Sequence, residues 1–279
     1  MKEMSYLSFQ ASTGASSKKD IGELVNDDHD YPFQIMPGGR KVVSSADIEK
    51  FPTGKNPNVL IHSTYICRPF GDESKSDLAR HCLKGYAQIA RRLGSRNVLV
   101  HMPYSPAELE RFGPGIELIR ESLEPYECEL HLETEPLTIS LRKQLDLSEG
   151  NAYSVYTSYV EKLFEVAPDA KLVVDTAHLF ANGLDTDDQI RFIEKFKSKI
   201  TFIHLNGNMN GKFRPDKHVP MFDARNKLCA ADKLSSYIAK LRKMCIVENS
   251  TEGATRPKWD EYADRFGFSI VSNFECFSY

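Results

Sequence analysis

The chain has 279 residues, a length typical of one α/β barrel or of two smaller domains. Its hydrophobic content of 41% and charged content of 27% are those of a globular protein, which excludes a disordered or fibrous chain. The net charge of -3 excludes the strongly basic character of proteins that coat nucleic acid.

Eight short apolar runs rich in Val, Ile and Phe predict β-strands. In chain order they are Tyr6 to Gln10, Pro32 to Met36, Asn58 to His62, Asn97 to His101, Cys128 to Glu133, Lys171 to Asp175, Ile200 to Leu205, and Met244 to Glu248. The runs are continuously apolar rather than alternating, which is typical of a parallel sheet that is buried on both faces.

The segments between the strands often carry apolar residues at helical spacing. One stripe is opened by Ser76 or Asp77 and closed by Gly94, and its members are Leu78, Cys82, Tyr86, Ile89 and Leu93. Three further stripes are Tyr156, Tyr159, Val160, Leu163 and Phe164; Ile190, Ile193 and Phe196; and Leu234, Tyr237, Ile238 and Leu241. These stripes predict crossover helices.

Strands that alternate with helices in this way predict a (β/α)8 TIM barrel, an α/β fold, formed as a single domain over residues 1–279. The alternative is a doubly wound open sheet. The chain has no Gly-rich fingerprint after its first strand, and Gly207 to Lys212 lacks the spacing of a phosphate loop. A nucleotide cofactor is therefore disfavoured.

No segment approaches the roughly 18 apolar residues of a membrane span, and the residues after Met1 are too polar for a signal peptide. The six cysteines are widely spaced without a C-x-x-C pair, which favours reduced core thiols: Cys67, Cys82, Cys128, Cys229, Cys245 and Cys276. We expect an intracellular protein of the cytoplasm or nucleus that is neither secreted nor bound to a membrane.

Six of the eight predicted strands end, or nearly end, in a residue that can bind a metal: His62, His101, Glu133, Asp175, His204 and Glu248. A parallel barrel brings the carboxyl ends of its strands to one rim, so these residues would converge there. His178, Asp216 and His218 lie in the loops after two of those strands and would join them.

Any one such residue more often caps a helix or bonds a nearby backbone group, but here the pattern repeats. Five of the eight histidines fall at these positions, and the acids would be crowded like charges unless cations compensate them. The remaining histidines are His29, His81 and His131. His131 shares a strand face with Glu133, yet we expect it to be packed or hydrogen-bonded.

Nine donors exceed the needs of one tetrahedral zinc and would fill about three metal sites. Mixed nitrogen and oxygen ligands favour zinc, manganese or iron over magnesium. The chain is therefore expected to bind about three Zn²⁺, with Mn²⁺ or Fe²⁺ as the alternative at one site. Metals held close together suit phosphoester hydrolysis, because they stabilise both the entering and the leaving oxygen.

The order of these residues resembles the endonuclease IV family of apurinic/apyrimidinic endonucleases, and the match spans most of the chain. The most specific piece is "VVDTAHLFANGLD", which is similar to the family segment D-T-C-H-x-F-A-A-G-Y-D. "FIHLN" is similar to its H-L-N, and "DKH" to its D-R-H. Every metal ligand of the family has a counterpart here.

The resemblance implies one metal on His62, His101 and Glu133, a second on Glu133, Asp175, His204 and Glu248, and a third on His178, Asp216 and His218. It implies that Glu133 and Glu248 are catalytic and orient the hydroxide that attacks the phosphorus 5′ to an abasic sugar. It also implies that Arg40, Tyr65 and Ile66 contact DNA. The implied partner is duplex DNA with abasic or 3′-blocked lesions, bound by a monomer.

Three segments depart from the family pattern: Thr134-Glu135-Pro136, Gly207-Asn208 and Val219-Pro220-Met221-Phe222. None removes a metal ligand, but all lie on the rim that would meet DNA. Arg68, Lys212 and Arg214 are further candidates for phosphate contacts, and three divalent cations would outweigh the negative net charge. Two alternatives stay open: a metal-dependent sugar isomerase or epimerase, and a damage-binding barrel with little cleavage activity.

Overall fold

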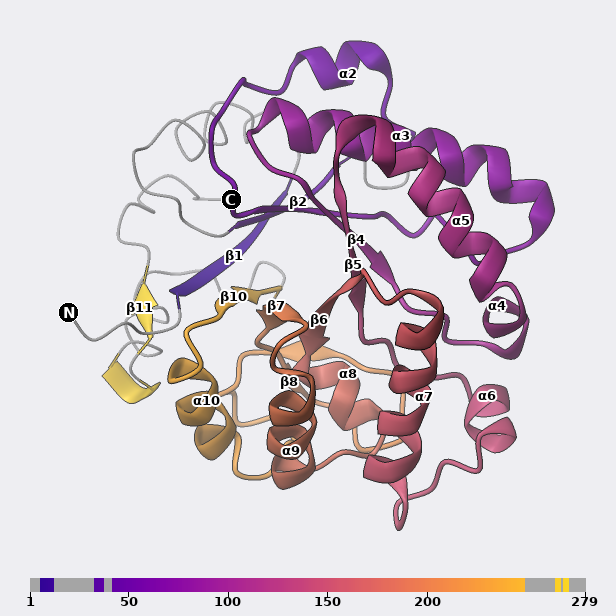
Figure 1. The fold of residues 1–279 in the computed structure, drawn as a ribbon. Coiled ribbons are helices and arrows are strands. Elements are labelled where there is room, and N and C mark those ends of the chain that lie inside the picture. The colour runs from indigo at the N-terminus through magenta and orange to yellow at the C-terminus, as the bar shows by residue number, and fades with distance from the viewer. Residues whose placement is uncertain (1–5, 13–32, 38–41, 249–263, 267, 271–279) are drawn as a thin grey trace. The chain divides into compact units, whose positions relative to one another are not determined.

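The computed structural model describes residues 6–12, 33–37, 42–248, 264–266 and 268–270 (Figure 1). All eight predicted strands form, within two residues of the apolar runs that predicted them. They are β1 Tyr6–Ser12, β2 Phe33–Met36, β3 Val59–His62, β4 Asn97–His101, β5 Glu129–Glu133, β6 Lys171–Asp175, β7 Ile200–His204 and β10 Met244–Val247.

The sheet has the strand order β10-β7-β6-β5-β4-β3-β2-β1-β11, and β10 also pairs with β1. The pairing is parallel, with Ile35 of β2 beside Ile61 of β3 and Cys245 of β10 beside Leu7 of β1. The eight predicted strands thus follow one another in chain order, and the last returns to the first. This is the topology of a parallel (β/α)8 barrel, which confirms the predicted fold class.

Along the chain, helices alternate with the strands. They are α2 Ser45–Glu49, α3 Ser76–Arg92, α4 Pro106–Glu110, α5 Phe112–Leu123, α6 Ile139–Gln144, α7 Ala152–Val166, α8 Thr176–Ala181, α9 Thr186–Phe196 and α10 Ala231–Ala239, with short 3₁₀ turns η1 Glu73–Lys75 and η2 Glu124–Tyr126. None of these helices combines the length and the apolar character that crossing a membrane requires.

The chain divides into two compact units. Unit 1 comprises Met1–Phe9, Glu133–Lys162 and Leu172–Tyr279, and unit 2 comprises Gln10–Leu132 and Leu163–Lys171. That residues 1–279 act as one domain stays a prediction.

In unit 2, α3 packs against α5 (Figure 1) and buries Cys82, Tyr86 and Ile89, as the helical stripe predicts. Leu78, expected on the same stripe, is instead 38% exposed. Each step of four residues turns the helix about 40° past a full turn, so Leu78 lies about 80° from Tyr86. It therefore sits at the edge of the buried face rather than at its centre.

Gly94 ends α3, as predicted. Its φ of +84° lies in the left-handed region, and a Cβ atom there would stand 2.4 Å from the Cα of Lys55. Only glycine meets both conditions without strain.

In unit 1, α9 and α10 lie side by side (Figure 1), and two short strands form a hairpin that the sequence did not predict. β8 Gly207–Asn208 pairs antiparallel with β9 His218–Val219, with Asn208 opposite His218. A two-residue strand is too short to show periodicity. The hairpin matters because it returns the chain to the end of β7 with Asp216 and His218 near its base. The short strand β11 Ser269–Ile270, beside β1, was also not predicted.

The cysteines only partly follow the expectation of core thiols. None of those in the described residues forms a disulfide, and Cys67, Cys82 and Cys245 are buried. Cys229 is exposed because it lies in the loop before α10. Cys276 and His29 lie outside the described residues.

Candidate metal centre

The structure places the strand-end residues where the sequence predicts them. His62 ends β3, His101 ends β4, Glu133 ends β5, Asp175 ends β6, His204 ends β7, and Glu248 follows β10. Glu133, Asp175 and His204 are completely buried. So many ionisable groups away from water are costly unless their charges are neutralised.

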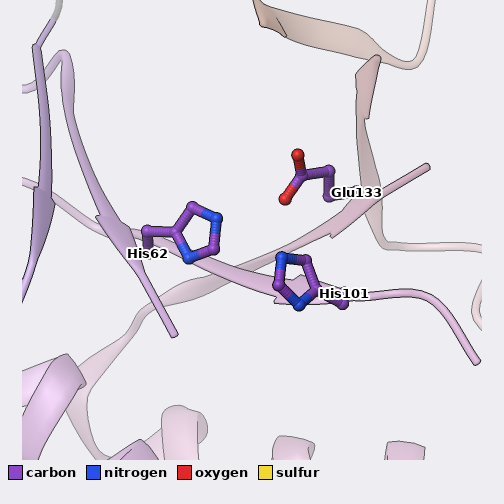
Figure 2. Close-up of side chains that lie close together, drawn as sticks. All are labelled: His62, His101 and Glu133. Carbon is purple, nitrogen blue, oxygen red and sulfur yellow. The ribbon is translucent and has the colours of Figure 1, made fainter. Parts of the chain in front are cut away.

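The first group consists of His62, His101 and Glu133, shown in Figure 2, whose ligand atoms lie within 4.8 Å of one another. The imidazole rings of His62 and His101 meet edge to face, with centroids 4.9 Å apart. His62 Nδ1 donates to the carbonyl oxygen of Ser63 at 2.7 Å. This hydrogen bond fixes the ring and leaves Nε2 with the lone pair that a metal requires.

The second group consists of Glu133, Asp175, His204 and Glu248. The Nδ1 atom of His204 lies 2.7 Å from Glu133 Oε1, 3.2 Å from Glu248 Oε2 and 3.8 Å from Asp175 Oδ2. Three carboxylates therefore surround one imidazole in a buried space. Burial opposes protonation of His204, but Glu248 and Glu133 outweigh it and raise the pKa of the imidazole well above its usual value. The pocket thus attracts positive charge.

The third group consists of Asp175, His178 and His218, with Asp216 beside them. The Nε2 atoms of His178 and His218 are 3.3 Å apart. Asp216 Oδ2 lies 2.9 Å from His218 Nε2 and 3.6 Å from His178 Nε2. His178 Nδ1 donates to the carbonyl oxygen of Thr134 at 2.6 Å, so its Nε2 turns toward the group. The structure therefore brings together all three ligands expected for the third metal.

Asp175 belongs to both the second and the third groups, whereas the family resemblance implied the second alone. Its Oδ1 caps α8 by accepting from the backbone N–H groups of Ala177 and His178 at 2.7 and 3.0 Å. Its Oδ2 lies 3.6 Å from His218 Nε2. The carboxylate is thus a helix cap through one oxygen and a candidate metal ligand through the other.

These groups fit divalent metal ions of the zinc class. Each offers three or four nitrogen and oxygen atoms within 4.8 Å of one another, the spacing of atoms that surround one ion at about 2.0–2.2 Å. Neutral imidazoles and ionised carboxylates are the ligand forms that such ions bind. Several of these metals share this preference, so the residues do not select one.

The family model of the xylose isomerase-like TIM barrel matches residues 45–242 of this chain, which is most of its length. The chain belongs to the xylose isomerase-like TIM barrel family. Comparison with curated proteins finds no match by sequence.

Several solved structures are similar to this xylose isomerase-like barrel. Endonuclease IV from Thermus thermophilus is 17% identical, with 94% of this chain and 97% of that chain covered and a TM-score of 0.63. A D-tagatose 3-epimerase-like protein is 18% identical, with 92% and 97% covered and a TM-score of 0.62. A second Thermus thermophilus protein, soaked with ZnCl2, is 14% identical, with 94% and 98% covered and a TM-score of 0.58. At such identities the likeness shows the fold alone.

Asn206 orients two of the candidate ligands in this barrel, a role that sequence reasoning missed. Its Nδ2 donates to Asp175 Oδ2 at 2.7 Å and to Glu248 Oε2 at 3.4 Å. Its Oδ1 accepts from the backbone N–H of Glu248 at 3.1 Å, and the residue is completely buried. The only sequence signal was its place in "FIHLN", two residues after a ligand. Outer contacts of this kind hold metal ligands in position.

The residues expected to contact DNA are only partly described. Arg40 lies outside the described residues. Tyr65 is 72% exposed in the loop after β3, with its ring centroid 5.8 Å from that of His101. Ile66 beside it is half-buried. An exposed aromatic ring next to a ligand is available to a substrate, and its role stays a prediction.

The other basic candidates differ in their surroundings. Nη2 of Arg68 lies 3.7 Å from Oε1 of Glu108, and its Cζ atom lies 5.3 Å from the centroid of the Tyr104 ring. Nζ of Lys212 lies 4.0 Å from Oε1 of Glu149, and Arg214 is exposed.

His131 has the packed role that the sequence favours. It is buried, and its Nε2 lies 3.1 Å from Asn97 Oδ1. Burial lowers its pKa to about 3, so the ring is neutral at physiological pH. An oxygen acceptor at this distance means that Nε2 carries the proton.

Proposed function

We propose that this barrel is a metal-dependent phosphodiesterase that nicks DNA 5′ to an abasic site and leaves a 3′-hydroxyl group, a step of base excision repair. The observation that supports this best is the third group of ligands. Asp216 and His218 meet His178 and Asp175 because the β8–β9 hairpin returns the chain to the end of β7. A phosphodiester has two reacting oxygens and a charged phosphorus centre, so it gains from several cations.

Divalent metals in these groups would supply Lewis-acid stabilisation and a lowered pKa for water. The chain's own residues would do the remaining work. Glu133 and Glu248 would orient the attacking water, because both carboxylates lie within 3.2 Å of the His204 imidazole in the second group. His178 and His218 would hold a metal ion in the third group, on the side of the site where the oxygen of the leaving group departs.

Glu248 is suited to contact the substrate water, because its side chain keeps 8% exposure while Glu133 has none. Its backbone N–H and its carboxylate are both held by Asn206. The carboxylate is therefore fixed in direction yet reachable from outside. Tyr65, exposed after β3, would stack on the opened DNA.

The experiment is a nicking assay with a duplex that carries one tetrahydrofuran abasic analogue. The wild-type protein should cut on the 5′ side of the lesion and leave a 3′-hydroxyl end. Glu248→Gln should lose cleavage by at least about a thousandfold while it keeps its fold, since the amide cannot take a proton. Glu161→Gln is the matched control, because Glu161 lies on α7 and pairs with Lys195.

An inactive wild-type protein that carries its metals would contradict the proposal, as would equal cleavage by the Glu248 and Glu161 variants. Binding of the abasic duplex without cleavage would instead indicate a damage-binding barrel.

The second candidate is a metal-dependent sugar isomerase or epimerase. The D-tagatose 3-epimerase-like structure has a TM-score of 0.62, against 0.63 for endonuclease IV. The second group alone, Glu133, Asp175, His204 and Glu248, is enough for one metal ion. Interconversion of free ketoses without any DNA nicking would favour this candidate.

A further inference from the structure

A depression of about 400 Å³ lies in unit 1, between α6 and the loop that joins β8 to β9. It is lined by Ile139, Arg142, Lys143, Asp146, Leu147 and Phe213. The size is in the range of small-molecule sites. None of the lining residues is a candidate metal ligand.

Arg142 is the unusual member of this lining. The residue is only 9% exposed, yet its side chain makes no hydrogen bond or ion pair with the residues that the structure describes. Its guanidinium stacks over the ring of Phe213 at 5.5 Å. Burial lowers its pKa, but a guanidinium does not deprotonate in proteins, so the positive charge remains.

Nothing in the lining neutralises this charge. Asp146 and Lys143 are both exposed to solvent, have opposite charges, and neither pairs with Arg142. The Nε atom of Arg142 is buried and has no hydrogen-bond partner among the described residues, so an anion that enters the pocket would give it the acceptor that it lacks. The planar fork of a guanidinium is suited to the oxygens of a phosphate group.

The aromatic wall of the pocket is held in place. Phe213 has a φ of +59°, and its backbone N–H donates to the carbonyl oxygen of Ala181 at 2.9 Å. Its ring is so close to Gly183 that a Cβ atom there would lie 2.4 Å from Cζ. The pocket is therefore formed before any ligand binds, and Ile139, Leu147 and Phe213 offer apolar surface beside the cation.

We propose that this pocket binds a nucleotide, with its phosphate group on Arg142 and its sugar or base against Ile139, Leu147 and Phe213. The nucleotide is either free in solution or part of a bound DNA strand. The second case rests on the proposed function. The chain connects the pocket to the third metal group, because Phe213 lies three residues before Asp216. The backbone N–H of Phe213 also donates to the last residue of α8, the helix that carries His178. This pocket is not formed by a glycine-rich loop, so the lack of phosphate-loop and dinucleotide motifs in the sequence is compatible with nucleotide binding here.

The test titrates the full-length, metal-containing protein with deoxyadenosine 5′-monophosphate, inorganic phosphate and deoxyadenosine. The nucleotide should bind saturably, and deoxyadenosine should bind more weakly because it lacks the phosphate. Arg142→Met should weaken nucleotide binding by about tenfold or more, and Arg142→Lys by less. Arg191→Met is the matched control, since Arg191 is exposed on α9 and pairs with Asp188.

A second readout separates ligand binding from a structural role. Without nucleotide, Arg142→Met should unfold at the same temperature as the wild type or higher, because it removes a buried N–H group that has no partner among the described residues. With nucleotide, the unfolding temperature should rise for the wild type and for Arg191→Met but not for Arg142→Met.

The same variants are then titrated with an uncut abasic duplex. A loss of duplex affinity in Arg142→Met assigns the site to the DNA strand, and a loss of nucleotide affinity alone assigns it to a free nucleotide. Affinities for both ligands that equal those of Arg191→Met would overturn the proposal. The nucleotide arm needs no cleavage, so it stands or falls separately from the nicking assay.

Discussion

Asn206 is the residue whose replacement should most clearly separate metal binding from folding. Its amide donates to the carboxylates of Asp175 and Glu248. Asn206→Asp keeps the shape but replaces a donor with a further negative charge in a buried space. We expect the affinity for metal to fall by about 10- to 100-fold, as for other contacts that orient ligands. Competition with a chromophoric chelator would measure the metal affinity of the variant and of the wild type.

Asn210→Asp is the control for this change. Asn210 Nδ2 donates to the carbonyl oxygen of Pro215 at an exposed position in the loop between β8 and β9. This variant should bind metal like the wild type. Equal metal affinity in the two variants would show that Asn206 does not position the ligands.

His131 gives a dependence of stability on pH that does not involve the metal groups. Its pKa falls from 6.5 to about 3 in the folded protein. Between these values the unfolded chain binds more protons, so the free energy of unfolding falls as the pH falls below 6.5. Each pH unit costs about 1.4 kcal/mol, and the loss ends near pH 3.

Urea unfolding of the wild type and of His131→Gln at pH 7 and pH 5 would check this. The wild type should lose about 2 kcal/mol more than the variant across this range, because glutamine does not titrate. Parallel losses in the two proteins would mean that His131 is protonated or solvated in the fold.

At the scale of elements, two glycines of unit 2 should respond in opposite directions to the same substitution. Gly94→Ala places a Cβ atom against the backbone of Lys55 at a positive φ, so it should destabilise the fold by about 2 kcal/mol or more. Gly113 lies in α5, and a Cβ atom added to it would meet nothing within 4 Å apart from its chain neighbours and its own helix, so Gly113→Ala should stabilise the fold by about 0.5–1 kcal/mol. Thermal or urea unfolding distinguishes these outcomes, and shifts of the same sign would contradict them.

The main elements of the barrel were predictable because their signals are local. A run such as Lys171 to Asp175 is apolar in its centre, since both faces of a parallel strand are buried. The β8–β9 hairpin was not predictable, because two residues carry no period and its pairing depends on contacts across a loop. Leu78 was misjudged because a four-residue spacing drifts around the helix, which places Leu78 at the edge of the buried face.

The metal groups were predictable for a different reason. Strand ends of a parallel barrel converge, so residues such as His62 and Glu133, 71 positions apart in the chain, are expected at one rim from topology. Their division into three groups came from the family resemblance. The contacts of Asn206 and the isolation of Arg142 were not predictable. They depend on side-chain directions and on the partners that a buried group has or lacks, and a single sequence does not record either.

For the molecule as a whole, the metal groups join folding to ligand binding. Three buried carboxylates face one imidazole in the second group, so their repulsion opposes folding when no cation is present. Removal of metal with a chelator should lower the unfolding temperature, and restored Zn²⁺ should raise it again. An unfolding temperature that does not respond to either treatment would argue against bound metal.

The most direct test is the metal content of the purified, unchelated protein, measured by elemental analysis against protein concentration. The three groups predict about two to three zinc-class ions per chain. A content near zero in a preparation that still cleaves abasic DNA would contradict the account.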